Sequence, residues 1–203
     1  MADRRTEGMS PRRSSAPATS RADLASYAGG TVPDLVGPDP TVLFIGINPS
    51  LWSAATGTHF ARPWNRFYPA LAAAGFTPHV IDARDGYRPE DRALLLERGI
   101  AITNIVARAT ARADELTRDE LLAGAAALPE RIARIGPRVI AFLGLTSYRT
   151  AFRRPRAAAG RQADEIADLP VWVLPNPSGL NAHESVHSLA AAYAEPGREA
   201  GAI

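Results

Sequence analysis

Two short apolar runs, each closed by the same tripeptide Asn-Pro-Ser, constrain the fold of this chain most. The first run occupies residues 42–47 and the second occupies residues 171–175. Runs of this length, rich in branched and aromatic residues, are typical of strands buried on both faces in a parallel sheet covered by helices. Loops that follow parallel strands open at one edge of the sheet, where such sheets bind ligands. The repeated polar turns at 48–50 and 176–178 therefore predict two walls of a single site.

The rest of the pattern alternates strands with helices. Strands are predicted at 41–46, 100–105, 139–143 and 171–175. Helices are predicted at 64–74, 89–98, 117–135, before Phe152 and at 183–195, with a long loop at 48–63. Thr117 and Glu120 have the spacing of a capping box at the start of the third helix. This alternation predicts an α/β fold, a three-layer α/β/α sandwich with a central, mainly parallel four-stranded sheet.

Length and composition limit the domain organisation. A chain of 203 residues and 21.6 kDa suits one well-buried domain, which we place at residues 31–197. Residues 1–30 have no apolar period and are predicted to be a disordered basic tail, and residues 198–203 a flexible C-terminus. No apolar run approaches the roughly 20 residues that cross a bilayer. Without cysteine, disulfides, thiolate metal sites and iron–sulfur clusters are excluded.

The charge of the chain permits contact with nucleic acid without requiring it. The formal net charge is +2, the isoelectric point is about 9.4, and every basic residue other than histidine is arginine. Because the chain contains no lysine, covalent catalysis through a lysine Schiff base is excluded. A basic loop at 153–163 either meets phosphates or is a solvated surface loop. Its arginines are Arg153, Arg154, Arg156 and Arg161.

Asn48 is the first candidate for chemistry. A carboxamide neither gains nor loses a proton near neutral pH, so it positions a water rather than acting as a general base. Positioning is sufficient where the transition state is already electron-poor, as in cleavage of an N-glycosidic bond through an oxocarbenium-like sugar. Backbone N–H groups of a tight loop can then stabilise the negative charge on the departing base. The alternative is that Asn48 and Pro49 only shape a turn.

Five patches occur in an order and spacing that are more specific than either Asn-Pro-Ser alone. They are 46–49, then Gly57, Phe60 and Pro63, then 65–67, then 103–106, and finally 176–180. Together they resemble the mismatch-specific uracil/thymine-DNA glycosylases of the uracil-DNA glycosylase superfamily. The resemblance covers most of the globular part, from the strand before Asn48 to the final helix. Arg66 is interpreted as a structural pairing residue within its helix and not as a catalytic residue.

The resemblance implies roles for residues on both loops. Asn48 would hold the hydrolytic water, and Phe60 would stack on a base flipped out of the duplex. Asn176 would close the pocket and donate its NH₂ group to a pyrimidine oxygen. The alternatives are core packing for Phe60 and an Asx turn for Asn176. The implied base pocket consists of Gly46, Ile47, Ser50, Ser53, Phe60, Asn104 and Asn176.

The same resemblance places a DNA wedge after the second Asn-Pro. Leu180 would fill the gap left by the flipped nucleotide, and the alternative is a buried leucine. Its neighbours would approach the DNA backbone; they are Ser178, Gly179 and Asn181. Two positions depart from relatives: Ser50 replaces a glycine, and Ala182 stands where some relatives have an arginine.

We therefore expect a monofunctional DNA glycosylase that hydrolyses the N-glycosidic bond of uracil mispaired with guanine, with thymine or etheno-cytosine as further substrates. The hydroxyl of Ser53 would disfavour the thymine methyl group. The expected partner is double-stranded DNA that contains a damaged or mispaired base, without metal, cofactor, membrane or obligate protein partner. We expect a bacterial cytoplasmic, nucleoid-associated protein.

Two alternatives remain at this point. The same fold can serve as a DNA-damage binding module that flips bases without cutting. Alternatively, His183, Glu184 and His187 match the H-E-x-x-H zinc pattern of metallohydrolases. No third histidine follows at the metzincin spacing, so we interpret this match as chance.

Overall fold

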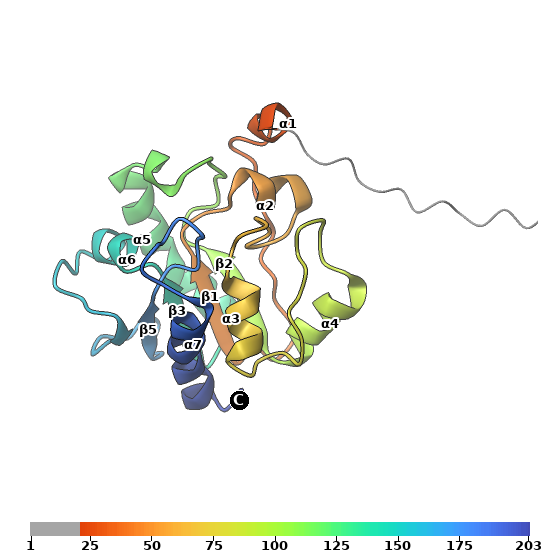
Figure 1. The fold of residues 1–203 in the computed structure, drawn as a ribbon. Coiled ribbons are helices and arrows are strands. Elements are labelled where there is room, and N and C mark those ends of the chain that lie inside the picture. Colours follow the sequence, from red (N-terminus) through yellow and green to blue (C-terminus); the bar gives the residue numbers. More distant parts are fainter. Residues whose placement is uncertain (1–20) are drawn as a thin grey trace, which may run out of the picture.

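The computed structural model describes residues 21–203 and contains one central sheet (Figure 1). Its strands lie in the order β2-β1-β3-β5-β4. The four parallel strands are β1 (Val42–Gly46), β2 (Ile100–Asn104), β3 (Val139–Leu143) and β5 (Val171–Leu174). The predicted α/β class and mainly parallel sheet are confirmed. The sheet has one strand more than predicted, because β4 (Gly160–Arg161) pairs antiparallel with β5 and is too short to give a sequence pattern.

The helices lie largely where the apolar periodicity predicted them. Their bounds are α1 (Arg21–Ala25), α2 (Leu51–Thr56), α3 (Phe67–Ala73), α4 (Pro89–Glu97), α5 (Arg118–Ile135), α6 (Leu145–Ala151) and α7 (Val186–Ala200). The predicted loop at 48–63 contains the unpredicted helix α2, whose six residues are too few to show a period. Of the helices described in residues 21–203, none is long and apolar enough to span a membrane.

Alternate residues of each parallel strand face opposite helical layers. In β1, Val42 and Phe44 belong to one core with residues of α3, α4 and α7, while Leu43 and Ile45 belong to a second core with residues of α5 and α6. Side chains on a strand alternate between its two faces, so burial on both faces requires the continuous apolar runs seen in the sequence. The three predicted layers are therefore present (Figure 1).

Helix α5 begins at the predicted capping box. The hydroxyl of Thr117 accepts a hydrogen bond from the backbone N–H of Glu120, and a carboxylate oxygen of Glu120 accepts one from the backbone N–H of Thr117 at 2.8 Å. Arg108 donates to the same carboxylate at 2.7 Å, and these bonds lower the pKa of Glu120 to about 2. The helix ends at Gly136, which adopts the left-handed conformation that favours glycine.

The two ends of the domain differ from the prediction. Residues 1–20 of the predicted tail lie outside the described residues, but residues 21–30 contain α1 and bond to the domain. Gly29 donates a backbone hydrogen bond to Ala109, and Ala109 donates one to Gly30. At the other end, α7 continues to Ala200, which is buried, so residues 198–200 belong to the final helix. The backbone hydrogen bonds of Gly29 and Gly30 could not be predicted, because they do not depend on a pattern of apolar side chains.

Candidate functional site

A cleft of about 300 Å³ opens where the four parallel strands end. Residues at the ends of these strands form its floor: Gly46 of β1, Asn104 of β2, Leu143 of β3, and Asn176 just after β5. Strand β2 lies on one side of β1, and the later strands β3 and β5 lie on the other, so the strand order reverses at β1. Proteins of the α/β class bind ligands at such a switch point. The two Asn-Pro-Ser loops thus contribute to one cleft, as the repeated turn predicted.

Most of the predicted site residues line this cleft. They are Gly46, Ile47, Asn48, Ser50, Ser53, Phe60, Asn104, Asn176, Ser178 and Leu180. Gly179 and Asn181 do not line it: the exposed Gly179 packs on Trp64, and Asn181 bonds to Asn176 and Arg66.

The Asn48 side chain is held in one orientation. Its Nδ2 donates to the backbone oxygen of Arg108 at 2.9 Å and to the hydroxyl of Thr110 at 2.7 Å. A carbonyl oxygen only accepts, so the NH₂ group must point to that wall. Thr110 donates its own proton to the backbone oxygen of Arg112 at 2.7 Å and is therefore free to accept from Asn48. Both N–H bonds of the amide are used, and Oδ1 is left as the acceptor available to the cleft.

The segment after β2 supports the loop that carries Asn48. Backbone hydrogen bonds run from Ile105 to Gly46, from Val106 to Ile47, and from Thr110 to Pro49, at 2.9 to 3.2 Å. The parallel pairing of β1 and β2 therefore continues beyond the sheet. This continuation fixes the loop backbone, and it brings residues 110–114 into the cleft wall, which the sequence did not predict.

Phe60 stands over Gly46 at the floor of the cleft. One face of its ring stacks on Phe67, with ring centroids 4.1 Å apart, while the ring also lines the cleft. Phe60 has a φ of 53°, a left-handed conformation that is costly for an aromatic residue and that occurs at functional sites. A Cβ at Gly46 would lie 3.2 Å from the Phe60 ring and 2.4 Å from Oδ1 of Asn104. Glycine is therefore required at position 46 for these two side chains to lie this close to the backbone of β1.

Ser50 and Ser53 form one wall through the start of α2. The hydroxyl of Ser50 caps this helix by accepting from the backbone N–H of Ser53 at 3.1 Å. The two hydroxyls lie 3.1 Å apart, and the hydroxyl of Ser53 also accepts from the backbone N–H of Ala61 at 3.4 Å. Ser50 is therefore part of the local fold as well as of the cleft surface.

Asn176 forms an Asx turn and still presents its amide to the cleft. Its Oδ1 accepts from the backbone N–H of Ser178 at 2.9 Å, which leaves the NH₂ group directed elsewhere. Among the residues that the structure describes, none accepts a hydrogen bond from this NH₂ group. The Asx turn and the predicted donor are thus compatible, because they use different atoms of one side chain.

The segment 176–184, between β5 and α7, forms an outer loop at the mouth of the cleft. Leu180 lies on this loop and is 72% exposed. The interpretation as a buried leucine is therefore wrong. Trp64, 55% exposed, lies against the same loop, with the guanidinium of Arg62 5.2 Å from its ring centroid. A Cβ at Gly179 would come within 2.6 Å of Trp64, so glycine permits the loop to pack on this ring. Exposed apolar side chains grouped at a cleft indicate a contact surface.

Arg66, at the start of α3, holds this outer loop in place. Its guanidinium donates to three backbone oxygens, those of Ser178, Asn181 and Glu184, the second at 2.8 Å. Its backbone N–H bonds to Pro177 at 3.0 Å. The sequence interpretation of Arg66 as a pairing residue within its own helix is wrong, because its partners lie in a loop more than 100 residues away along the chain.

The zinc pattern lacks the geometry that it requires. Ser185 caps α7, so His183 and Glu184 precede the helix and His187 lies in its first turn. The two histidines therefore do not share a helical face, and Glu184 instead accepts a hydrogen bond from Ser188 at 2.6 Å. Within residues 21–203, no three histidine, aspartate or glutamate side chains group as metal ligands.

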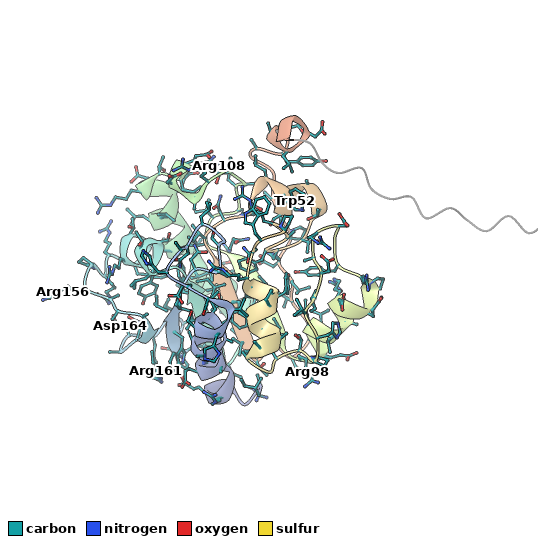
Figure 2. The ribbon with its side chains drawn as sticks, viewed as in Figure 1. Trp52, Arg98, Arg108, Arg156, Arg161 and Asp164 are labelled. Atoms are coloured by element: carbon teal, nitrogen blue, oxygen red, sulfur yellow. The ribbon has the colours of Figure 1, made fainter. Side chains whose placement is uncertain are left out.

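The basic loop contains β4, the strand at the edge of the sheet next to β5. Figure 2 shows Arg156 and Arg161 on this side, away from Trp52 of α2. Arg161 pairs with Glu199 at 2.9 Å, and Arg154 pairs with Asp164 at 2.7 Å. These pairs favour the solvated-loop interpretation over phosphate contact.

Several cleft residues were not predicted from the sequence. They are His59, Arg62, Asn65, Leu143 and the segment at 110–114. His59 is 3% exposed and contacts Asn104 through Nδ1. The sequence contains one indication that His59 lies in the cleft: it directly precedes Phe60, a predicted pocket residue.

Comparison with known proteins identifies the family. The sequence model of the Uracil DNA glycosylase superfamily matches residues 33–195, most of the chain. A solution NMR structure of a "putative Uracil DNA glycosylase" from Methanosarcina acetivorans is similar in fold, with a TM-score of 0.54 and 17% sequence identity. That match covers 85% of this chain and 98% of the archaeal one. With its cleft at the carboxyl ends of the strands and both Asn-Pro loops in place, this chain belongs to the uracil DNA glycosylase superfamily and is a DNA glycosylase.

Proposed function

We propose that this enzyme is a monofunctional, mismatch-specific glycosylase that removes uracil opposite guanine in double-stranded DNA. The observation that carries the proposal is the fixed amide of Asn48. Two wall acceptors hold its Nδ2, and Oδ1 remains free within the cleft. An acceptor in this position orients a water molecule without deprotonating it beforehand.

The bond changes follow from that arrangement. The bond between the sugar C1′ and the base nitrogen breaks, and its electron pair leaves with the base. The water held by Asn48 adds to the resulting oxocarbenium-like carbon and loses a proton to solvent. Negative charge on the departing base is stabilised by the N–H groups of the Asn48 loop and by the free NH₂ group of Asn176. Because the chain has no lysine, the product is a free base and an intact abasic site.

Recognition of the flipped base uses the floor of the cleft. Phe60, supported from behind by Phe67, offers a ring on which a pyrimidine stacks. The side chain of Asn104 offers hydrogen-bonding atoms to the edge of the base. Ser53, held against Ser50, leaves less room for a methyl group than a smaller residue would, so uracil is preferred over thymine.

Leu180 provides the wedge that keeps the base outside the duplex. Its exposed side chain lies on a loop fixed by Arg66, at the mouth of the same cleft. Inserting an apolar side chain into the stack offsets the unstacking of one base step, which costs a few kcal/mol. The neighbouring Ser178 and Gly179 bring the loop backbone toward a phosphate, although Gly179 itself packs on Trp64.

The test is a panel of duplexes that differ at one base pair. Purified protein in excess is incubated with duplexes containing uracil opposite guanine, uracil opposite adenine, thymine opposite guanine, or etheno-cytosine opposite guanine. We expect fastest release of uracil opposite guanine, slower release of thymine, and no strand cleavage without alkali. Tight binding of every duplex without base release would instead support a damage-binding module, and equal release opposite adenine would reject mismatch specificity.

A further inference from the structure

His59 is a buried cleft residue whose protonation state is set by its two neighbours. Its Nε2 lies 2.9 Å from the backbone oxygen of Pro33, and its Nδ1 lies 3.2 Å from Nδ2 of Asn104. A backbone oxygen only accepts hydrogen bonds, so Nε2 must carry a proton. Burial lowers the pKa of His59, so the ring carries only this proton, and Nδ1 is the acceptor that the NH₂ group of Asn104 meets. The imidazole is therefore neutral, with its proton on Nε2.

The surrounding structure holds His59 in this state. The hydroxyl of Tyr68 donates to the backbone oxygen of His59 at 2.9 Å, and Tyr87 completes the chain through Tyr68 at 2.6 Å. Burial lowers the pKa of His59, against opposing contributions from the Pro33 hydrogen bond and the negative charge of Asp34. The ring and the backbone of His59 are thus both fixed at the wall of the cleft.

This arrangement dictates which atom of the Asn104 amide faces the cleft. With Nδ2 committed to His59, Oδ1 lies over Gly46, where a Cβ would be only 2.4 Å away. Rotating the amide by a half-turn would set Oδ1 against the lone pair of Nδ1 and leave both acceptors unsatisfied in a buried site. The Asn104 amide therefore presents two groups to the cleft: its Oδ1 as an acceptor and the second N–H of Nδ2 as a donor.

Uracil and cytosine require opposite orientations of such an amide. Uracil presents an N–H donor at N3 beside an acceptor oxygen at C4, whereas cytosine presents an acceptor at N3 beside an amino donor at C4. An amide with Oδ1 and one N–H fixed in place matches the uracil pair of groups. The reversed amide would match cytosine, which is the normal base and must be spared.

We propose that His59 is a positioning residue that fixes the Asn104 amide and thereby makes the enzyme select uracil over cytosine. The proposal rests on the proposed function, because it assumes that Asn104 meets the Watson–Crick edge of the flipped base. It assigns to His59 no contact with the reacting atoms. Its effect is on the choice of base.

The functional test compares two bases in one strand context. Duplexes with one uracil or one cytosine opposite guanine are incubated with excess wild-type or His59→Leu protein, and base release is followed in single turnovers. Loss of one hydrogen bond at a buried amide is expected to slow uracil release about 10-fold. Cytosine release should rise above that of the wild type, because the amide is free to reverse. His79→Leu, which removes an exposed histidine bonded to Asp91, is the matched control and should change neither rate.

The outcomes separate this proposal from the proposed function. If wild type releases no uracil from any substrate, the proposed function fails. If wild type releases uracil but His59→Leu shows no gain in cytosine release, the contact is merely structural and the role of His59 is rejected. A second measurement does not depend on activity: ¹⁵N NMR of wild-type His59 should show a neutral ring protonated at Nε2 at pH 7. A proton on Nδ1 would overturn the proposal.

Discussion

Replacing Thr110 by valine tests whether the orientation of Asn48 matters for catalysis. Valine keeps the shape of threonine but removes the hydroxyl that accepts from Asn48 Nδ2 at 2.7 Å. The second bond of this NH₂ group, to the backbone of Arg108 at 2.9 Å, remains. One hydrogen bond contributes about 1 kcal/mol, which corresponds to about a fivefold change in rate. Because the bond from Thr110 to Arg112 is also lost, we expect a fall of about 5- to 10-fold in base release.

The assay is single-turnover release of uracil from a duplex with uracil opposite guanine, with duplex affinity measured in parallel by fluorescence anisotropy. Affinity should stay within about twofold of wild type, since Thr110 orients Asn48 and is not assigned a DNA contact. Thr110→Ser keeps the hydroxyl and should restore most of the rate. Thr150→Val, which removes a hydroxyl that bonds within α6 at 3.2 Å, is the control. Full activity of Thr110→Val, or equal defects in the valine and serine variants, would refute the reasoning.

Three further predictions concern the wedge, its support and the stability of α5. Leu180→Ala should slow excision about 10-fold or more in duplex DNA but little in single strands, because only the duplex must be unstacked; equal losses in both would reject the wedge. Arg66→Lys loses the forked contact with three loop oxygens and should slow excision in duplex DNA more than in single strands. An equal fall of the excision rate in both substrates would contradict the assigned role of Arg66. The pKa of Glu120 is lowered from 4.5 to about 2, so its stabilising contribution is complete above pH 4.5 and disappears as the pH falls toward 2. Denaturant unfolding should therefore show Glu120→Gln less stable than wild type at pH 7 and equally stable near pH 2; an undiminished difference at low pH would contradict this origin.

The sheet could be predicted because its signal is local. Each parallel strand is buried on both faces, so it appears in the sequence as an uninterrupted apolar run, and β3 matches its predicted bounds of 139–143. The capping box of Thr117 and Glu120 is likewise local. By contrast, the final helix begins at Val186 rather than at residue 183, because Ser185 caps it. Short elements such as α2 and β4 are stabilised by contacts with distant segments and leave no pattern.

The cleft was predictable only in part, because only some of its features depend on local sequence. Both Asn-Pro-Ser loops follow strands, so the fold class alone places them together. The amide orientations of Asn48 and Asn104 depend on Arg108, Thr110 and His59, whose positions relative to the loops are set by the tertiary fold. Similarly, the arginine that fixes the wedge loop lies over 100 residues away from it. A sequence indicates which side chains carry chemistry, whereas the folded structure determines which of their atoms are free.

The central claim is that Asn48 holds the attacking water, and one measurement tests it most directly. Single-turnover uracil release by Asn48→Ala is compared with wild type on a duplex with uracil opposite guanine, at protein concentrations that saturate binding. Misplacement of a reacting group commonly costs about 100-fold, so we expect at least that loss of rate with duplex affinity largely retained. Release at the wild-type rate would contradict the account.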